Sequence, residues 1–227
     1  MNTMTFPRLF LFCDHKIPAN RGLDDRVLAA VGKSNPLVAW IPSGARPEKT
    51  DEFFANRRAY YAELGVTNVE MFALHRDFRE DRIPWLLSCD IIHLSGGDAF
   101  TFLPLLRKTR ILDALHGYAS RGGILVGDCG GAMLMARDIE ICLFGKIPPP
   151  PGLKDLSALG LVDFEFHPHL GTYGADLETL REYSRRKSCV VYAAPDGAGL
   201  SVLGKEIKPH GKVTRIINGT AEVLDAD

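Results

Sequence analysis

Short apolar segments alternate with amphipathic segments along the first 130 residues of the chain. The apolar segments are rich in Val, Ile, Leu and Phe, and they occupy residues 8–13, 37–42, 69–74, 90–95 and 123–127. Most are continuously apolar, which is typical of strands buried on both faces of a parallel sheet. Helical periodicity predicts helices within residues 23–33, 51–65, 82–88 and 100–122. This order predicts an α/β fold with a three-layer, doubly wound, mostly parallel sheet and right-handed crossovers.

The alternation of apolar strands with amphipathic helices gives way to mostly short strands beyond residue 160. We expect an apolar strand over 161–166 and a helix over 176–186, followed by short, turn-separated strands at 189–194, 197–204, 212–218 and 220–225. These strands are expected to make the end of the sheet partly antiparallel. Residues 146–155 are rich in proline and are expected to form a loop. Because the chain shows neither a repeat nor a linker, we expect residues 1–227 to form a single domain.

Composition argues against several classes of function. The net charge is −1, which gives no reason to expect nucleic acid or an anionic membrane as a partner. No apolar run approaches the length of a bilayer span, and the N-terminus lacks the pattern of a signal peptide. The five cysteines form no CxxC pair, so neither a disulfide framework nor a zinc site is indicated. A reduced, cytoplasmic location is therefore expected.

Cys129 lies in the stretch GDCGG, between an apolar strand and a predicted helix. A strand–turn–helix with small residues around a nucleophile is typical of a nucleophile elbow, whose tight turn lifts the side chain clear. The N-terminus of the following helix favours the thiolate. The amide of Gly130 is a candidate oxyanion donor, and a second donor is expected from Gly97 or Asp98 after the preceding strand. The alternative is that both glycine turns serve close packing and that Cys129 is a buried structural residue.

The stretch FEFHPHLG provides the candidate general base. The strand at 161–166 is expected to deliver His167 and His169 at its carboxyl end, on the same sheet edge as the elbow. If the strand stays extended, both histidines share a face, and one or both could reach Cys129. A metal site on this pair is less favoured because no third ligand is evident, and neither a metal nor an organic cofactor is expected. His15, beyond the first strand, could line the cleft.

Several motifs follow one another in a characteristic order. In chain order they are IPSGARP, Gly96-Gly97-Asp98 after an apolar strand, Gly122-Gly123, the elbow from Gly127 to Ala132, FEFHPHL and APDGAGLSV. Together they resemble the peptidase E (aspartyl dipeptidase) and cyanophycinase family of serine peptidases. The resemblance implies a class I glutamine-amidotransferase-like, flavodoxin-like fold, a hydrolase of peptide or amide bonds, and a catalytic histidine at His169. The chain departs from the family at Cys129, where the family has serine, at Gly130, where it has alanine, and at His167, where it has asparagine.

The third catalytic residue is not uniform in that family. Cyanophycinase-like members take an acid from the late turn, whose counterpart here is Asp196, whereas dipeptidase-like members take an aspartate where this chain has Phe144. We therefore expect Asp196 to orient His169, with Asp138 and Glu140 as alternatives. An ordinary turn aspartate remains the alternative role for Asp196.

Substrate selectivity also departs from the dipeptidases, whose arginines after the histidine hold an acidic substrate. Leu177 and Leu180 occupy those positions, so we expect poor hydrolysis of Asp-X dipeptides unless Arg181 or Arg46 supplies the cation. Asp98 and His167 are further candidates for substrate contacts. The sequence thus predicts a cysteine hydrolase of a small peptide or amide, and a homodimer is compatible with it. The alternatives are a glutamine-amidotransferase-like amidase and a non-catalytic binding or redox-sensing homologue.

Overall fold

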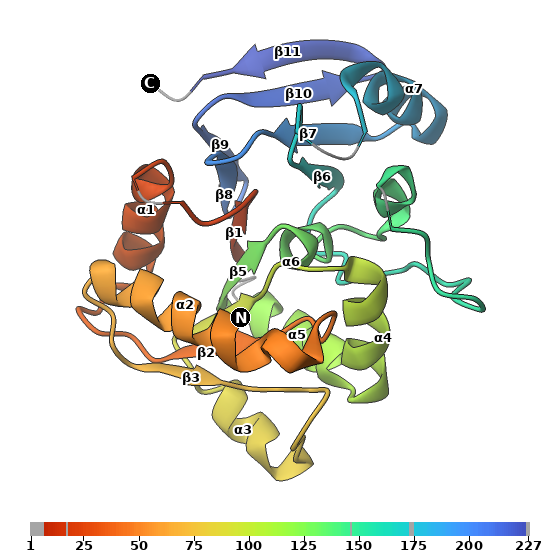
Figure 1. Ribbon diagram of the computed structural model, residues 1–227. Helices are drawn as coiled ribbons and strands as arrows, with labels where there is room; N and C mark the ends of the chain where they lie inside the picture. The colour runs from red at the N-terminus through yellow and green to blue at the C-terminus, as the bar shows by residue number, and fades with distance from the viewer. Residues whose placement is uncertain (1–6, 17, 146, 173–174, 226–227) are drawn as a thin grey trace, which may run out of the picture.

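The computed structural model of the protein describes residues 7–16, 18–145, 147–172 and 175–225. Its larger sheet has seven strands in the order β3-β2-β4-β5-β1-β8-β9 (Figure 1). The strands are β1 (Arg8–Phe12), β2 (Val38–Ile41), β3 (Val69–Met71), β4 (Ile91–Leu94), β5 (Ile124–Asp128), β8 (Gly199–Leu203) and β9 (Glu206–His210). The first five run parallel, and β8 and β9 extend the sheet antiparallel beyond β1. The predicted mostly parallel α/β sheet is confirmed.

Helices cover both faces of this sheet, which explains why most of its parallel strands are continuously apolar. Leu9 and Leu11 of β1 pack on one face against α4 (Ala99–Lys108) and α5 (Ile111–Ser120). Phe10 and Phe12 pack on the opposite face against α1 (Arg21–Val31) and α2 (Thr50–Glu63). Successive strand residues point to opposite faces, so a strand covered on both sides needs apolar residues at every position.

The remaining helices are short, and they are α3 (Ile83–Leu86), α6 (Gly130–Met133) and the 3₁₀ helices η1 (Pro47–Lys49), η2 (Glu80–Arg82) and η3 (Glu140–Phe144). The helix predicted over 100–122 is divided into α4 and α5, because Arg110 adopts a left-handed φ of 58° between them. None of the helices in the described segments is both long and apolar enough to cross a bilayer.

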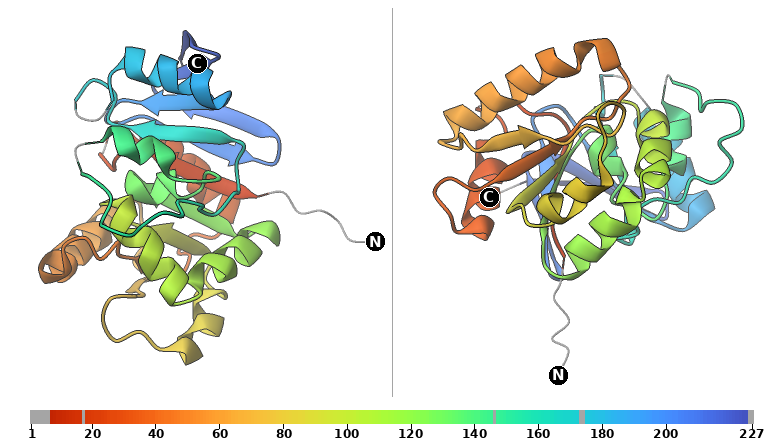
Figure 2. Two further views of the ribbon diagram at one scale, coloured as in Figure 1. Left: turned by 90° about the vertical axis from the view of Figure 1, so that its right-hand side faces the viewer. Right: turned by 90° about the horizontal axis from the view of Figure 1, so that it is seen from below.

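Four C-terminal strands form a second sheet rather than the end of the first, which corrects the prediction of one sheet. They are β6 (Phe164–Pro168), β7 (Val190–Ala194), β10 (Val213–Ile217) and β11 (Thr220–Leu224), in the order β11-β10-β7-β6. Helix α7 (Leu177–Lys187) packs on one face of this sheet, and the other face joins the core of the larger sheet. Figure 2 shows the second sheet stacked beyond the β8–β9 end of the molecule. Strand β9 was not predicted, because its sequence EIKPH is polar and half-exposed at the sheet edge.

Candidate active site

The elbow between β5 and α6 holds Cys129 in a strained conformation. Its φ is 46° and its ψ is −109°, a combination that side-chain-bearing residues rarely adopt outside functional turns. The neighbouring glycines allow close approach. A Cβ at Gly127 would lie 2.7 Å from the backbone of Ala132, and one at Gly131 would lie 2.3 Å from the carbonyl oxygen of Leu94. Packing therefore explains the glycines, but it leaves the strained presentation of the thiol unexplained.

Close packing between two loops explains why this chain has glycine at position 130, where the family that it resembles has alanine. A Cβ at Gly130 would lie only 2.1 Å from the carbonyl oxygen of Gly97, in the loop between β4 and α4. The two loops are thus closer together than alanine permits. This contact brings the backbone N–H groups of Gly97 and Gly130 to the same sulfur, and both act to lower the pKa of Cys129.

His169 lies between Cys129 and Asp196. Its Nε2 is 3.3 Å from the Cys129 sulfur, and its Nδ1 is 2.7 Å from Oδ1 of Asp196, in the turn between β7 and β8. The imidazole is 7% exposed, so these contacts are held within the protein. The geometry places the three residues in the order of a nucleophile–base–acid triad.

The route by which His169 reaches the elbow differs from the prediction in two respects. Strand β6 belongs to the second sheet, so His169 approaches from a different sheet and not along the shared edge. The strand also ends at Pro168, because His169 has a left-handed φ of 61°. The condition for both histidines to share a face, a strand that stays extended through His169, is therefore not met. His169 contacts Cys129, whereas His167 is 3% exposed and both of its ring nitrogens are buried with no hydrogen-bond partner among the described residues.

The two alternative acids lie beside α7. Lys187 binds Asp138 at 2.5 Å and Glu140 at 3.3 Å, and Arg186 also binds Glu140, at 2.9 Å. Both carboxylates thus have cationic partners near the C-terminus of α7, where positive side chains also complement the helix dipole. Asp196 is the acid that the fold brings to His169.

Two residues that sequence reasoning missed complete the surroundings of His169. The Cys13 sulfur, just after β1, accepts the backbone N–H of His169 at 3.0 Å and lies 3.5 Å from its Nδ1. Lys16 binds Asp196 at 2.8 Å and Asp14 at 2.9 Å. Because β1 lies between β5 and β8 in the sheet, the loop that follows it faces both the elbow and the Asp196 turn. The sequence FCDHK carries no spacing signal for these contacts.

Charge and burial set the protonation of the site. Burial raises the pKa of the Cys129 thiol to about 12, with a further increase from the charge of Asp128, and the two amide donors only partly offset these effects. Hydrogen bonds from Lys16 and then His169 hold the pKa of Asp196 at about 2. At neutral pH the site therefore contains a protonated thiol and an anionic acid.

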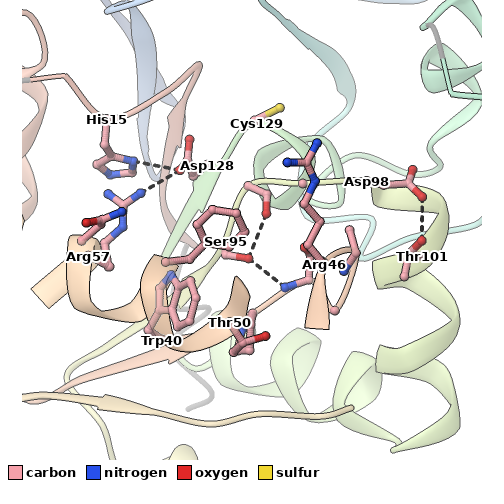
Figure 3. Close-up of a pocket in the computed structure, with 18 of the residues that line it drawn as sticks. His15, Trp40, Arg46, Thr50, Arg57, Ser95, Asp98, Thr101, Asp128 and Cys129 are labelled. Carbon is pink, nitrogen blue, oxygen red and sulfur yellow. Dashed lines mark hydrogen bonds and ion pairs between the residues drawn. The ribbon is translucent and has the colours of Figure 1, made fainter. Parts of the chain in front are cut away.

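A buried ionic cluster lies directly beside Cys129. Asp128, adjacent to Cys129, binds Arg57 of α2 at 2.9 Å and His15 at 3.3 Å (Figure 3). Burial alone would raise the pKa of Asp128, but His15 and Arg57 outweigh it and the pKa is lowered. Burial and then the Arg57 charge lower the pKa of His15 to about 4, so the charge balancing Asp128 at neutral pH comes from Arg57. His15 was expected at the cleft, whereas the role of Arg57 had no sequence signal.

A pocket of about 740 Å³ opens beside Cys129 and is lined by Arg46, Arg57 and Asp98 among others. Figure 3 shows the Arg46 guanidinium directed into the pocket, whereas the Asp98 carboxylate points toward Thr101. Asp98 caps α4, accepting the Phe100 N–H at 3.0 Å and the Thr101 hydroxyl at 2.6 Å, so its carboxylate is already engaged.

The other predicted substrate contacts do not line this pocket. Arg181 lies on α7 and contacts Glu178 at 3.4 Å, and Leu180 of the same helix is fully buried against the second sheet. His167 is buried elsewhere in β6 and is likewise absent from the pocket wall. Of the two candidate cations that the sequence suggested, Arg46 is the one the fold places in the pocket.

Comparisons with known proteins agree with this fold. The family model described as peptidase family S51 matches residues 11–209. "Uncharacterized peptidase PM1590" of Pasteurella multocida (strain Pm70) is 25% identical over 136 residues, which is 60% of this chain and 65% of that protein. "Peptidase E" of Streptomyces coelicolor is 26% identical over 181 residues, which is 74% of this chain and 72% of that protein. The chain thus spans just under two thirds of the first of these relatives.

Two solved structures share the fold. A putative peptidase E protein from Listeria monocytogenes EGD-e has a TM-score of 0.71 at 19% identity, covering 91% of this chain and 98% of that one. A peptidase from an acI-B1 Actinobacterium has a TM-score of 0.68 at 14% identity, covering 98% of this chain and 96% of that one.

Proposed function

The chain belongs to peptidase family S51, and from this premise we propose that it is a cysteine peptidase of small peptides, with Cys129 as nucleophile. The observation that supports this most directly is the position of the His169 imidazole, 3.3 Å from the Cys129 sulfur and 2.7 Å from Asp196. A serine-family elbow that carries cysteine keeps the same attack geometry, because a thiol needs the same base and the same oxyanion donors.

In the proposed reaction, Cys129 attacks the scissile carbonyl carbon while its proton passes to Nε2 of His169. The raised pKa of Cys129 favours this general-base route over a preformed thiolate–imidazolium pair. Asp196 accepts the Nδ1 proton in a hydrogen bond and thereby presents an unprotonated Nε2 to the thiol. The oxyanion is stabilised by the amides of Gly97 and Gly130. His169 then protonates the leaving amine, and water hydrolyses the thioester.

The pocket also bears on the substrate. The predicted rejection of Asp-X dipeptides rested on Leu177 and Leu180, but Arg46 places a cation in the pocket, and no ion pair engages it within the described residues. We propose that the substrate is a small peptide and that Arg46 sets its charge preference. The pocket volume of about 740 Å³ suits such a ligand, because small-molecule sites usually enclose roughly 300–1,000 Å³.

The test is turnover of a panel of neutral and acidic dipeptides and short amides, including glutamine, by the purified protein. We expect peptide hydrolysis that disappears in Cys129→Ala and persists in Cys189→Ala, a matched thiol removal in a different part of the fold. Asp196→Asn should lower kcat by roughly 10²–10⁴-fold, because the wrong imidazole tautomer would face the thiol. Hydrolysis that survives Cys129→Ala would refute the assignment of Cys129 as the nucleophile. Turnover of glutamine alone would favour the amidase, and labelling of Cys129 without any turnover would favour a binding or redox-sensing protein.

A further inference from the structure

Two further side chains of metal-ligating type, Cys13 and Asp196, lie beside Nδ1 of His169, on the edge of the imidazole that faces away from Cys129. The Cys13 sulfur, Nδ1 of His169 and Oδ1 of Asp196 all lie within 4.8 Å of one another. We propose that these residues form an inhibitory binding site for a thiophilic divalent cation, with Zn²⁺ as the best fit. The HxH pattern thus contributes one histidine to a metal site, and the ligands missing from the sequence pattern come from the loop after β1 and from the β7–β8 turn.

The spacing of the three atoms is close to that of a zinc centre. Zinc bonds of about 2.0–2.3 Å in tetrahedral geometry put ligand atoms roughly 3.4–3.6 Å apart. The Cys13 sulfur lies 3.5 Å from Nδ1 of His169 and 3.6 Å from Oδ1 of Asp196. The third separation, between Nδ1 and Oδ1, is 2.7 Å and must open by less than about 1 Å. The half-exposed Asp196 can make that movement, and it leaves the fourth position to water.

Burial and the nearby carboxylates raise the pKa of the Cys13 thiol, so a thiolate there needs a cation or a hydrogen-bond donor to stabilise it. The backbone N–H of His169 already donates to the sulfur at 3.0 Å, and such a donor stabilises the negative charge that a bound thiolate carries. Asp14 lies near Asp196 through their shared partner Lys16 and adds a second carboxylate to the neighbourhood. Lys16 opposes a cation, but its amine is solvent-exposed and binds Oδ2 of Asp196, the oxygen that the metal does not need.

The other cluster of possible ligands is less suited to a cation. His15, His93 and Asp128 also converge, but the guanidinium of Arg57 lies 2.9 Å from Asp128. That charge lowers the pKa of both histidines after burial, which shows how strongly the cluster already resists positive charge. A second cation would have to displace a buried arginine there, whereas at Cys13 it displaces a thiol proton and one hydrogen bond.

Binding would block the proposed reaction through the histidine tautomer, and this consequence rests on the proposed role of His169. The cation binds the Cys13 thiolate, and the thiol proton leaves to solvent. It also takes the lone pair of Nδ1, so the proton of the neutral imidazole resides on Nε2. Nε2–H cannot accept the Cys129 proton, and Asp196 is no longer free to hold the imidazole. The enzyme is then inhibited without any metal bond to its nucleophile.

Direct binding is tested with Co²⁺ as a spectroscopic substitute for Zn²⁺, followed by displacement with Zn²⁺ and titration calorimetry. We expect one equivalent of Co²⁺ to give a thiolate-to-cobalt charge-transfer band in the unmodified protein and in Cys129→Ala. Cys13→Ser should lose the band, and Asp196→Asn, an exposed change that keeps the fold, should weaken binding at least tenfold. Lys16→Met should tighten binding severalfold, because a like charge is removed. A band that vanishes in Cys129→Ala, or one that survives both Cys13→Ser and Asp196→Asn, would overturn the site.

The inhibitory step is tested separately on peptide turnover. We expect Zn²⁺ to inhibit reversibly, with activity restored by a chelator, and we expect Lys16→Met to need severalfold less Zn²⁺ for half-inhibition. If Co²⁺ binds as described but no peptide is hydrolysed under any condition, the proposed function fails and the metal site stands. If peptides are hydrolysed and neither cation binds with the Cys13 dependence described, the metal site fails and the proposed function stands.

Discussion

Gly130→Ala tests whether the two glycine loops form an oxyanion hole. The added Cβ would lie 2.1 Å from the carbonyl oxygen of Gly97, against a closest tolerable contact of about 3 Å, so the loops must separate by roughly 1 Å. Relief cannot come from a side-chain rotation, because the atom it meets belongs to the backbone. Both proposed donors, the amides of Gly97 and Gly130, belong to the segments that must move.

The size of the effect follows from this displacement. A misplacement of about 1 Å costs roughly 10²-fold in rate, and the loss of one oxyanion donor costs about 10²–10³-fold in kcat. We therefore expect kcat to fall by at least roughly 100-fold with little change in KM. Overpacking should also lower the free energy of unfolding by about 1–3 kcal/mol.

The assay pairs steady-state peptide hydrolysis with urea unfolding, and Gly22→Ala is the matched control. Gly22 lies in α1, where the added Cβ would make an ordinary contact of 3.8 Å with His210. That variant should keep its kcat and gain up to about 1 kcal/mol from helix propensity. A Gly130→Ala protein whose kcat stays within about twofold of the unmodified enzyme, with or without a loss of stability, would refute the oxyanion assignment.

Three further predictions concern the thiols, a buried carboxyl group and the pocket. In a titration with iodoacetamide, Cys129 should be alkylated first even though burial raises its pKa to about 12, because Nε2 of His169 can take the thiol proton and two amides stabilise the sulfur as it reacts. Earlier labelling of Cys189, whose pKa burial raises less, to about 11, would contradict this. Burial raises the pKa of Glu165 from 4.5 to about 7 although the charge of Lys187 acts to lower it. The folded state therefore binds this proton more tightly than the unfolded state does. The stability that results is fully present below pH 4.5 and is lost as the pH rises to about 7. Urea unfolding should therefore show Glu165→Gln gaining on the order of 2–3 kcal/mol over the unmodified protein between pH 4.5 and pH 8, and parallel pH profiles would rule this out. Arg46→Met should lower the ratio of kcat/KM for acidic over neutral dipeptides by roughly tenfold, and an unchanged ratio would remove Arg46 from substrate selection.

The parts of the fold that could be predicted are those coded by local patterns. Most of the parallel strands β1 to β5 are continuously apolar because helices bury both of their faces, and this pattern is visible in the chain itself. The elbow at Cys129 was predictable because its signal, a cysteine flanked by glycines directly after an apolar strand, is local, and the close approach that requires Gly127 is to Ala132 in the same turn. His169 and Asp196 were named from motif resemblance, and they lie within hydrogen-bonding distance of one another.

The division into two sheets could not be predicted, because β7 and β8 have similar apolar patterns and only long-range pairing decides which sheet each joins. Strand β6 shows the consequence: its sequence suggested an extended HxH pair, but the left-handed turn at His169 separates the two histidines.

The immediate environment of Cys129 was also decided by tertiary structure alone. Cys13 comes to His169, and Arg57 to Asp128, across separations of 156 and 71 residues. No local spacing encodes such contacts, since they depend on which strands are neighbours and on how α2 crosses the sheet. The sequence by itself determined which side chains are available for chemistry. Their protonation was decided by the fold, because burial and the charges of distant residues shift a pKa only once the chain has brought them together.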